Sequence, residues 1–141
     1  MSRIVGLDHG SRRIGVAVGE AETGLAFARP ALPAGDTARL VDLVRREGGE
    51  LVVIGLPRNM DGSEGPQAEA VRRFGDRLAA LGLTVSYQDE RLSSWQAAEQ
   101  LSAAGKRTDR RSGELDSAAA RVILQDYLDA RTRPSDPQET E

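Results

Sequence analysis

The sequence has no cysteine, few aromatic residues and no long apolar run. Without cysteine, neither a disulfide framework nor a thiolate zinc site can form. The apolar runs, of which residues 4–7 are the first, are much shorter than the ~20 residues that a membrane span needs. No charged segment followed by a long apolar stretch indicates export. We therefore expect a cytoplasmic protein with no membrane partner.

A length of 141 residues and a hydrophobic content of 39% are typical of one globular domain. We predict a single domain over residues 1–131 and a disordered acidic tail over residues 132–141. The net charge of −3 does not indicate a nucleic-acid-binding protein. One segment is nevertheless basic, and it could be a solvated loop or a phosphate contact. Its cationic residues are Lys106, Arg107, Arg110 and Arg111.

Hydrophobic periodicity predicts strands and helices that alternate along most of the chain. Strands are expected at residues 4–7, 14–19, 25–28, 51–56 and 84–89, and helices at about 37–47, 66–81, 93–104 and 115–130. Pro30 and Pro33 are expected to end the third strand. Leading antiparallel strands followed by alternating helices and strands predict an α/β fold, a mixed sheet with helices on its faces. The stripe expected to be buried on the last helix is Leu115, Ala118, Ala119, Val122 and Ile123.

Three carboxylates stand at the ends of predicted core elements. Asp8 ends the first strand, Glu90 ends the last strand, and Asp116 lies in the first turn of the last helix. If the two strands are neighbours, Asp8 and Glu90 project from the same edge of the sheet. Converging carboxylates repel each other unless a cation is present, and oxygen ligands suit Mg²⁺ or Mn²⁺. Each acid could instead cap a turn, satisfy a helix dipole or form a surface ion pair.

Several further side chains could contact phosphate or a base. A Gly-Ser turn presents backbone N–H groups, and arginine binds phosphate with two hydrogen bonds. The candidates for phosphate contact are Ser11, Arg12, Arg13, Arg58, Asn59 and Arg91, besides the basic segment. His9, the only histidine, could be a metal ligand or a proton shuttle, or simply an exposed residue. Trp95 could stack on a base but is more typical of a core residue at a helix start.

Four strings occur together and in order: GLDHGSRRIGVAVG at 6–19, VIGLPRNMDGSE at 53–64, DERLSS at 89–94 and LDSAAARVILQDYL at 115–128. With them the chain resembles the YqgF/RuvX family of RNase H-like proteins over about residues 3–128. The resemblance implies a five-stranded mixed sheet, its first three strands antiparallel, flanked by helices. It also implies that Asp8, Glu90 and Asp116 are catalytic and bind the metal. Strict strand alternation leaves Asp89 as an alternative or supporting ligand.

The family is described both as nucleases of the 16S ribosomal RNA precursor and as Holliday-junction-resolvase-like enzymes. The resemblance therefore implies a metal-dependent endonuclease that acts on precursor rRNA, with ribosomal particles as further partners. Cleavage of branched DNA is the alternative, and it implies a homodimer with two sites. Two other classes stay open. One is a nucleotide phosphotransferase, which would need a second lobe, and the other is a non-catalytic nucleic-acid-binding or ribosome-binding protein.

Overall fold

The computed structural model describes residues 3–91 and 112–132, with side chains described for 3–90 and 117–131. The predicted helix at 93–104, Trp95, the basic segment and residues 133–141 of the predicted tail lie outside these ranges. The elements follow the order β1 (Arg3–His9), β2 (Arg13–Glu20), β3 (Leu25–Pro33), α1 (Thr37–Arg46), β4 (Gly49–Arg58), α2 (Pro66–Ala80), β5 (Val85–Arg91) and α4 (Ser112–Thr132).

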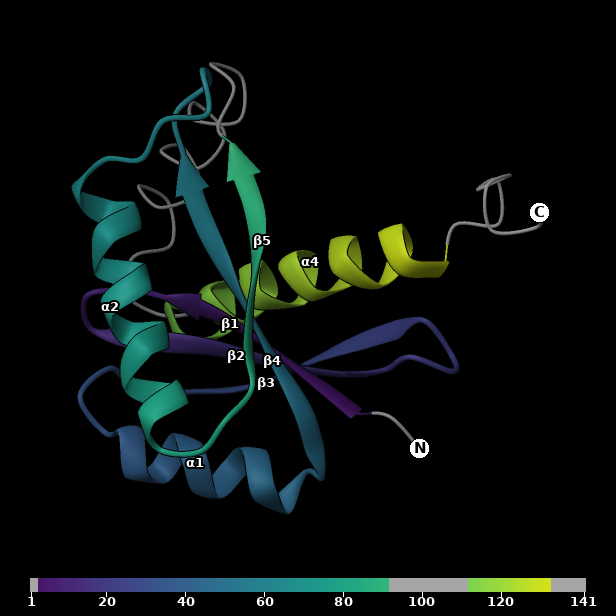
Figure 1. The fold of residues 1–141 in the computed structure, drawn as a ribbon. Helices are drawn as coiled ribbons and strands as arrows, with labels where there is room; N and C mark the ends of the chain where they lie inside the picture. Colours follow the sequence, from purple (N-terminus) through teal and green to yellow (C-terminus); the bar gives the residue numbers. More distant parts are fainter. Residues whose placement is uncertain (1–2, 92–111, 133–141) are drawn as a thin grey trace.

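The strands form one five-stranded mixed sheet in the order β3-β2-β1-β4-β5 (Figure 1). The first three strands are antiparallel, while β1, β4 and β5 run parallel to one another. This arrangement confirms the predicted mixed sheet. Strands β1 and β5 are not neighbours, because β4 lies between them, but their carboxyl ends still point toward the same edge.

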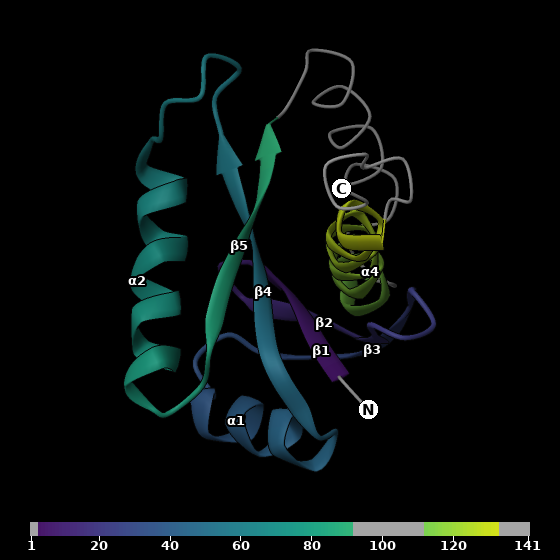
Figure 2. The ribbon, with the colours of Figure 1, turned by 45° about the vertical axis from the view of Figure 1, so that its right-hand side comes forward.

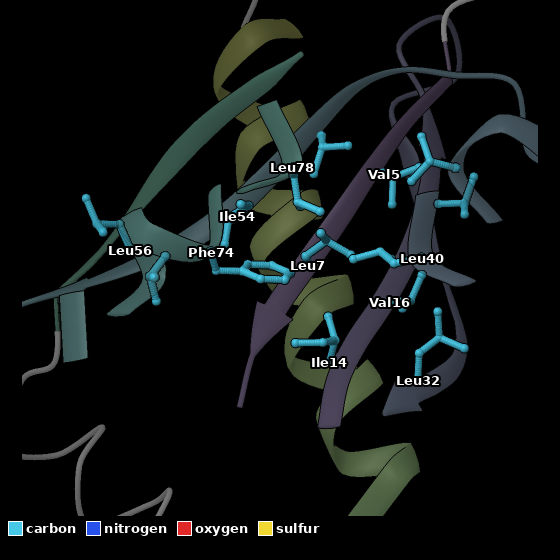
Figure 3. Packing of buried hydrophobic residues seen from close by; sticks show 14 of the residues in the cluster. Val5, Leu7, Ile14, Val16, Leu32, Leu40, Ile54, Leu56, Phe74 and Leu78 are labelled. Atoms are coloured by element: carbon cyan, nitrogen blue, oxygen red, sulfur yellow. The ribbon is translucent and has the colours of Figure 1, made fainter. Parts of the chain in front are cut away.

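The two faces of the sheet are covered by different helices (Figure 2). Alternation sends Val5 and Leu7 of β1 into a core with α1 and α2, as the close view shows around Phe74 (Figure 3). Ile4, which precedes Val5, packs instead against α4, in a second cluster with Leu124. The side of the sheet to which a strand residue points therefore decides which helix it meets.

Helix α4 packs directly on strand backbone at two glycines. A Cβ atom at Gly6 would lie 2.7 Å from the Cβ of Leu124, and one at Gly55 would lie 2.6 Å from the Cδ1 of Ile123. Real Cβ atoms do not come this close to another carbon, because dispersion attraction turns to repulsion. Glycine at these positions thus sets how near α4 lies to β1 and β4.

The third strand is longer than predicted. It runs to Pro33 through Pro30, whereas the sequence pattern predicted its end at residue 28. In the sheet that the described residues form, β3 is an edge strand, where proline is tolerated because one side of the backbone does not take part in the ladder of hydrogen bonds. The prediction of a strand end was wrong because edge position cannot be recognised from local composition.

The helices agree more closely with expectation. Asp36 caps α1, and its Oδ1 accepts a hydrogen bond from the backbone N–H of Arg39 at 3.1 Å. Helix α4 starts at Ser112, three residues earlier than predicted. Its predicted stripe was wrong at two positions, because Ala118 and Val122 are exposed. The side chains that α4 buries are Ser117, Ala120, Ile123, Leu124 and Leu128. Among helices of the described residues, none has the length and hydropathy that crossing a bilayer would require.

Candidate active site

Asp8 and Glu90 lie at the same edge and on the same face of the sheet. Asp8 follows Ile4 and Gly6 at two-residue intervals, so it faces α4. On β5, Tyr87 packs against the core on the α2 side, which sends Glu90 to the opposite face. A Cβ atom at Gly55, beneath α4, would lie 3.5 Å from the Cγ of Glu90. Both carboxylates therefore lie at the edge of the sheet formed by the carboxyl ends of β1, β4 and β5, on the face that α4 covers.

Asp89, the alternative to Glu90, is directed differently. Its Oδ2 accepts a 3.5 Å hydrogen bond from Nη1 of Arg58, which stands on β4 two positions beyond Leu56, the register partner of Asp89. Alternation places Asp89 on the side of the sheet that α2 covers, with Tyr87. The geometry therefore groups Glu90, and not Asp89, with Asp8.

Burial and nearby negative charge raise the pKa of Glu90 to about 7. Burial has the largest effect, followed by the charges of Asp126, Asp89 and Asp8. Desolvation and like charge both disfavour the ionised carboxylate. The contribution of Asp8 indicates that the two acids are within electrostatic reach. Asp126 on α4 was missed in the sequence, although it follows the buried Ile123 by three residues and so shares its side of the helix.

The turn of α4 that carries Asp116 lies over the neighbouring end of β1. The next residue, Ser117, is buried, and its Oγ accepts a hydrogen bond from the backbone N–H of Val16 at 3.4 Å. Val16 pairs with Leu7 on β1, directly before Asp8. The backbone of this turn is thus held beside Asp8, while the Asp116 side chain lies outside the described side chains.

The donor chemistry of this edge fits a hard divalent cation. Carboxylate oxygens are the ligands that Mg²⁺ and Mn²⁺ prefer, and a cation would offset both the burial and the nearby negative charges that raise the pKa of Glu90. Within the described side chains, no group of three or more His, Cys, Asp or Glu residues is close enough to hold a metal. The described side chains include Asp8 and Glu90 but not Asp116, so the predicted three-acid metal site stays a prediction.

The turn between β1 and β2 lies at the same edge as Asp8. The N–H of Gly10 donates to the carbonyl of Arg13 at 3.0 Å and closes the turn. Ser11, Arg12 and Arg13 are all exposed. This position suits the predicted phosphate contacts, because the turn directly follows the strand that carries Asp8.

Arg58 is paired with carboxylates. Its Nη2 lies 3.3 Å from Oε2 of Glu64, in addition to the contact with Asp89. Arg72 donates two hydrogen bonds of 2.7 Å to the same Glu64. Hydrogen bonding from Arg72 is the largest cause of the lowered pKa of Glu64. Arg58 could therefore reach a phosphate only by exchanging one of its carboxylate partners.

The remaining phosphate candidates are placed only in part. The side chain of Asn59 is exposed and donates a 2.8 Å hydrogen bond to Oγ of Ser63 within the turn that follows β4. Arg91 ends β5 opposite Arg58, but its side chain is outside the described set. The same holds for Lys106, Arg107, Arg110 and Arg111.

His9 lies on the face of the sheet opposite Asp8. Its ring stacks on Phe74 of α2, with centroids 4.6 Å apart and planes tilted by 36°. Burial, and then the positive charge of Arg77, lower the pKa of His9. This environment indicates a neutral, packed histidine and does not group it with the acids.

Comparison with known proteins adds evidence on family and fold. The family model described as "RuvX: Holliday junction resolvase" matches residues 2–130. Two similar curated proteins are named "Putative pre-16S rRNA nuclease". The one from Moorella thermoacetica is 49% identical, covering 90% of this chain and 94% of that protein. The one from Chloroflexus aggregans is 44% identical, covering 93% and 96%.

Solved structures show a similar fold at low sequence identity. A Thermus thermophilus RuvC in complex with a Holliday junction substrate aligns with TM-score 0.50 and 18% identity, covering 94% of this chain and 97% of that one. A Fowlpox virus resolvase bound to Holliday junction DNA aligns with TM-score 0.52 and 9% identity, covering 93% and 99%. At such identities the likeness establishes the fold alone.

Proposed function

The chain belongs to the RuvX family, and we propose that it is a nuclease that hydrolyses phosphodiester bonds, with precursor 16S rRNA as its cellular substrate. Two curated relatives that are 44% and 49% identical carry names that include pre-16S rRNA nuclease. Both align over at least 90% of this chain, so the likeness extends across the whole predicted domain.

The observation that carries the proposal is the convergence of Asp8 and Glu90 on the α4 side of the carboxyl edge. They come from β1 and β5, which are separated by β4, so the sheet topology and not sequence proximity brings them together. Burial, and then the negative charges of Asp126, Asp89 and Asp8, disfavour the ionised form of Glu90, so an ionised carboxylate here costs folding free energy unless a ligand offsets it. Functional sites are where such costs are commonly found.

Asp8, Glu90 and Asp116 are the residues that would hold Mg²⁺ or Mn²⁺. Such ions, when bound, lower the pKa of a coordinated water and neutralise charge on phosphoryl oxygens. Because the pKa of Glu90 is about 7, this carboxyl carries a proton in a large fraction of molecules at neutral pH. Glu90 must release that proton to become a ligand, so metal binding is expected to strengthen as pH rises.

The other residues of this edge would bind and orient the polyanion. The exposed turn with Ser11, Arg12 and Arg13 presents cationic side chains next to Asp8. Arg58 ends β4 and Asn59 follows it, while Arg91 ends β5, at the same edge. Contacts of this kind hold the backbone in register without reading sequence.

Branched DNA is the second candidate substrate, favoured by the description of the matching family as a Holliday junction resolvase. Cutting a symmetric four-way junction would require two copies of the chain, each supplying one site. For branched DNA the proposal includes a homodimer. For precursor 16S rRNA it includes binding to ribosomal particles.

The test is cleavage by purified protein with Mn²⁺ or Mg²⁺ of precursor 16S rRNA and, separately, of a synthetic four-way junction. Asp8→Asn should lower cleavage of the true substrate by more than about 100-fold. Loss of a group that only supports a metal ligand typically costs up to about that factor. Asp42→Asn removes an exposed carboxylate on α1 and serves as the matched control, with full activity expected. Unchanged cleavage by the Asp8 variant would exclude the proposed site.

A further inference from the structure

The register between β2 and β3 shifts next to the proposed site. Ile14 pairs with Leu32, but Val16 pairs with Arg29, so two residues of β3 stand opposite the single residue Gly15. An extra residue on one strand is a β-bulge, which disrupts the ladder of hydrogen bonds locally. One of the two bulged residues is Pro30, which has no N–H to contribute.

The hydroxyl of Ser117 on α4 bonds both strands at this bulge. The backbone N–H of Val16 donates to Oγ of Ser117 at 3.4 Å, and the Ser117 hydroxyl donates to the carbonyl of Arg29. Within the described side chains, Ser117 is the only polar or charged one that is buried, with 2% of its surface exposed. One hydroxyl thus serves as acceptor for Val16 and as donor to Arg29, two residues that the register pairs across β2 and β3.

The bulge lies directly beside the acids. Gly15, the residue opposite the bulge, pairs with Asp8 on the other neighbouring strand, β1. Asp116 immediately precedes Ser117 in the first turns of α4. The bulge therefore joins the strand next to Asp8 with the helical turn that carries Asp116.

We propose that Ser117 is a positioning residue, whose insertion into the β2–β3 bulge fixes the Asp116 turn beside Asp8 for metal binding. The inference rests on the proposed function, because it assigns Asp116 to the metal site. A buried hydroxyl with two backbone partners tolerates little displacement, since moving it would leave buried polar groups unpaired. The depth and rotation of the helix start are thereby set by the sheet that carries Asp8.

The same helix provides a matched control at a distance. The side chain of Gln125 also bonds backbone at the start of β3, donating to the carbonyl of Gly24, just before the strand, at 2.7 Å and accepting from the N–H of Ala26 at 3.1 Å. It lies eight residues after Ser117, about 12 Å along the helix axis. Loss of this contact also weakens the attachment of α4 to the sheet, but far from the Asp116 turn.

The experiment compares Ser117→Ala, Ser117→Thr and Gln125→Ala with wild-type protein. Mn²⁺ affinity is measured by calorimetry without nucleic acid, cleavage is measured with Mn²⁺, and urea unfolding shows that each variant is folded. We expect Ser117→Ala to bind Mn²⁺ about 10-fold to 100-fold more weakly, as for other groups that support metal ligands. Ser117→Thr keeps the hydroxyl and should bind more tightly than Ser117→Ala, while Gln125→Ala should match wild-type affinity.

Wild-type affinity in Ser117→Ala would overturn the proposal, as would equal weakening in Gln125→Ala or no recovery in Ser117→Thr. If Ser117→Ala loses Mn²⁺ affinity but the wild-type protein cuts no nucleic acid, the positioning role stands and the nuclease function falls. If the wild-type protein cuts nucleic acid, and Ser117→Ala cuts and binds Mn²⁺ equally well, the nuclease function stands and the positioning role of Ser117 falls. A wild-type protein that binds no Mn²⁺ would overturn both.

Discussion

Replacing Glu90 by glutamine is expected to stabilise the metal-free protein at alkaline pH and to leave it unchanged at acid pH. The folded state raises the pKa of Glu90 from 4.5 to about 7. The folded state thus holds the Glu90 proton more tightly than the unfolded state does. The stability contributed by this proton is fully present below pH 4.5 and is lost as pH rises through about 7.

The size of the effect follows from the same pKa. The full difference in pKa corresponds to at most about 3 kcal/mol of unfolding free energy. Glu90 keeps part of its surface in water, which screens the neighbouring charges, so we expect about 1–2 kcal/mol. Glutamine has no charge to desolvate, so Glu90→Gln should gain this amount above pH 8.

Urea unfolding of both proteins in a chelator, at pH 4.5 and pH 8.5, measures the difference. Glu50→Gln removes an exposed carboxylate from β4 and should not reproduce the pH dependence. Added Mn²⁺ should raise the stability of the wild type at pH 8.5 more than that of Glu90→Gln, because a ligand stabilises the state that binds it. The same difference between Glu90→Gln and wild type at both pH values would refute the argued environment of Glu90.

Two further predictions concern packing on opposite faces of the sheet. Gly6→Ala should lower stability by about 1–3 kcal/mol, since its Cβ would meet Leu124 at 2.7 Å. Gly35→Ala, which has no atom within 4 Å of the new Cβ, is the control in the same unfolding assay, and equal losses would contradict the close packing of α4. The lowered pKa of His9 predicts that stability falls as pH drops below 6.5, because the unfolded state takes up the proton first. His9→Phe should keep the stacking on Phe74 and flatten this part of the pH profile of the urea midpoint, and an unchanged profile would exclude His9 as its source.

The sequence predicted those features of the fold that depend on local periodicity. Short apolar runs, and alternation at residues 84–89, identified the five strands, and the predicted helix starts at residues 37 and 66 agree with α1 and α2. Local composition failed where the neighbours of an element decide the outcome. The prolines of β3 are compatible with a strand because, among the described residues, no strand pairs on its outer side. Helix α4 buries a different stripe because side chains such as Leu124 pack against glycines of the sheet.

For the candidate site, the sequence and its family resemblance predicted which side chains would carry the chemistry: the acids Asp8, Glu90 and Asp116, each at the end of an element. Only the tertiary structure decided how Asp8 and Glu90 relate to their neighbours. Because side chains alternate along a strand, Asp8 and Glu90 lie on the face of the sheet that α4 covers, whereas His9 and Asp89 lie on the face that α2 covers. The role of Ser117 had no signal in the sequence, because a hydroxyl can complete a bulge only once two strands and a helix have met. Spacing along a chain defines a face of one element, whereas a site is made by faces that come together through packing.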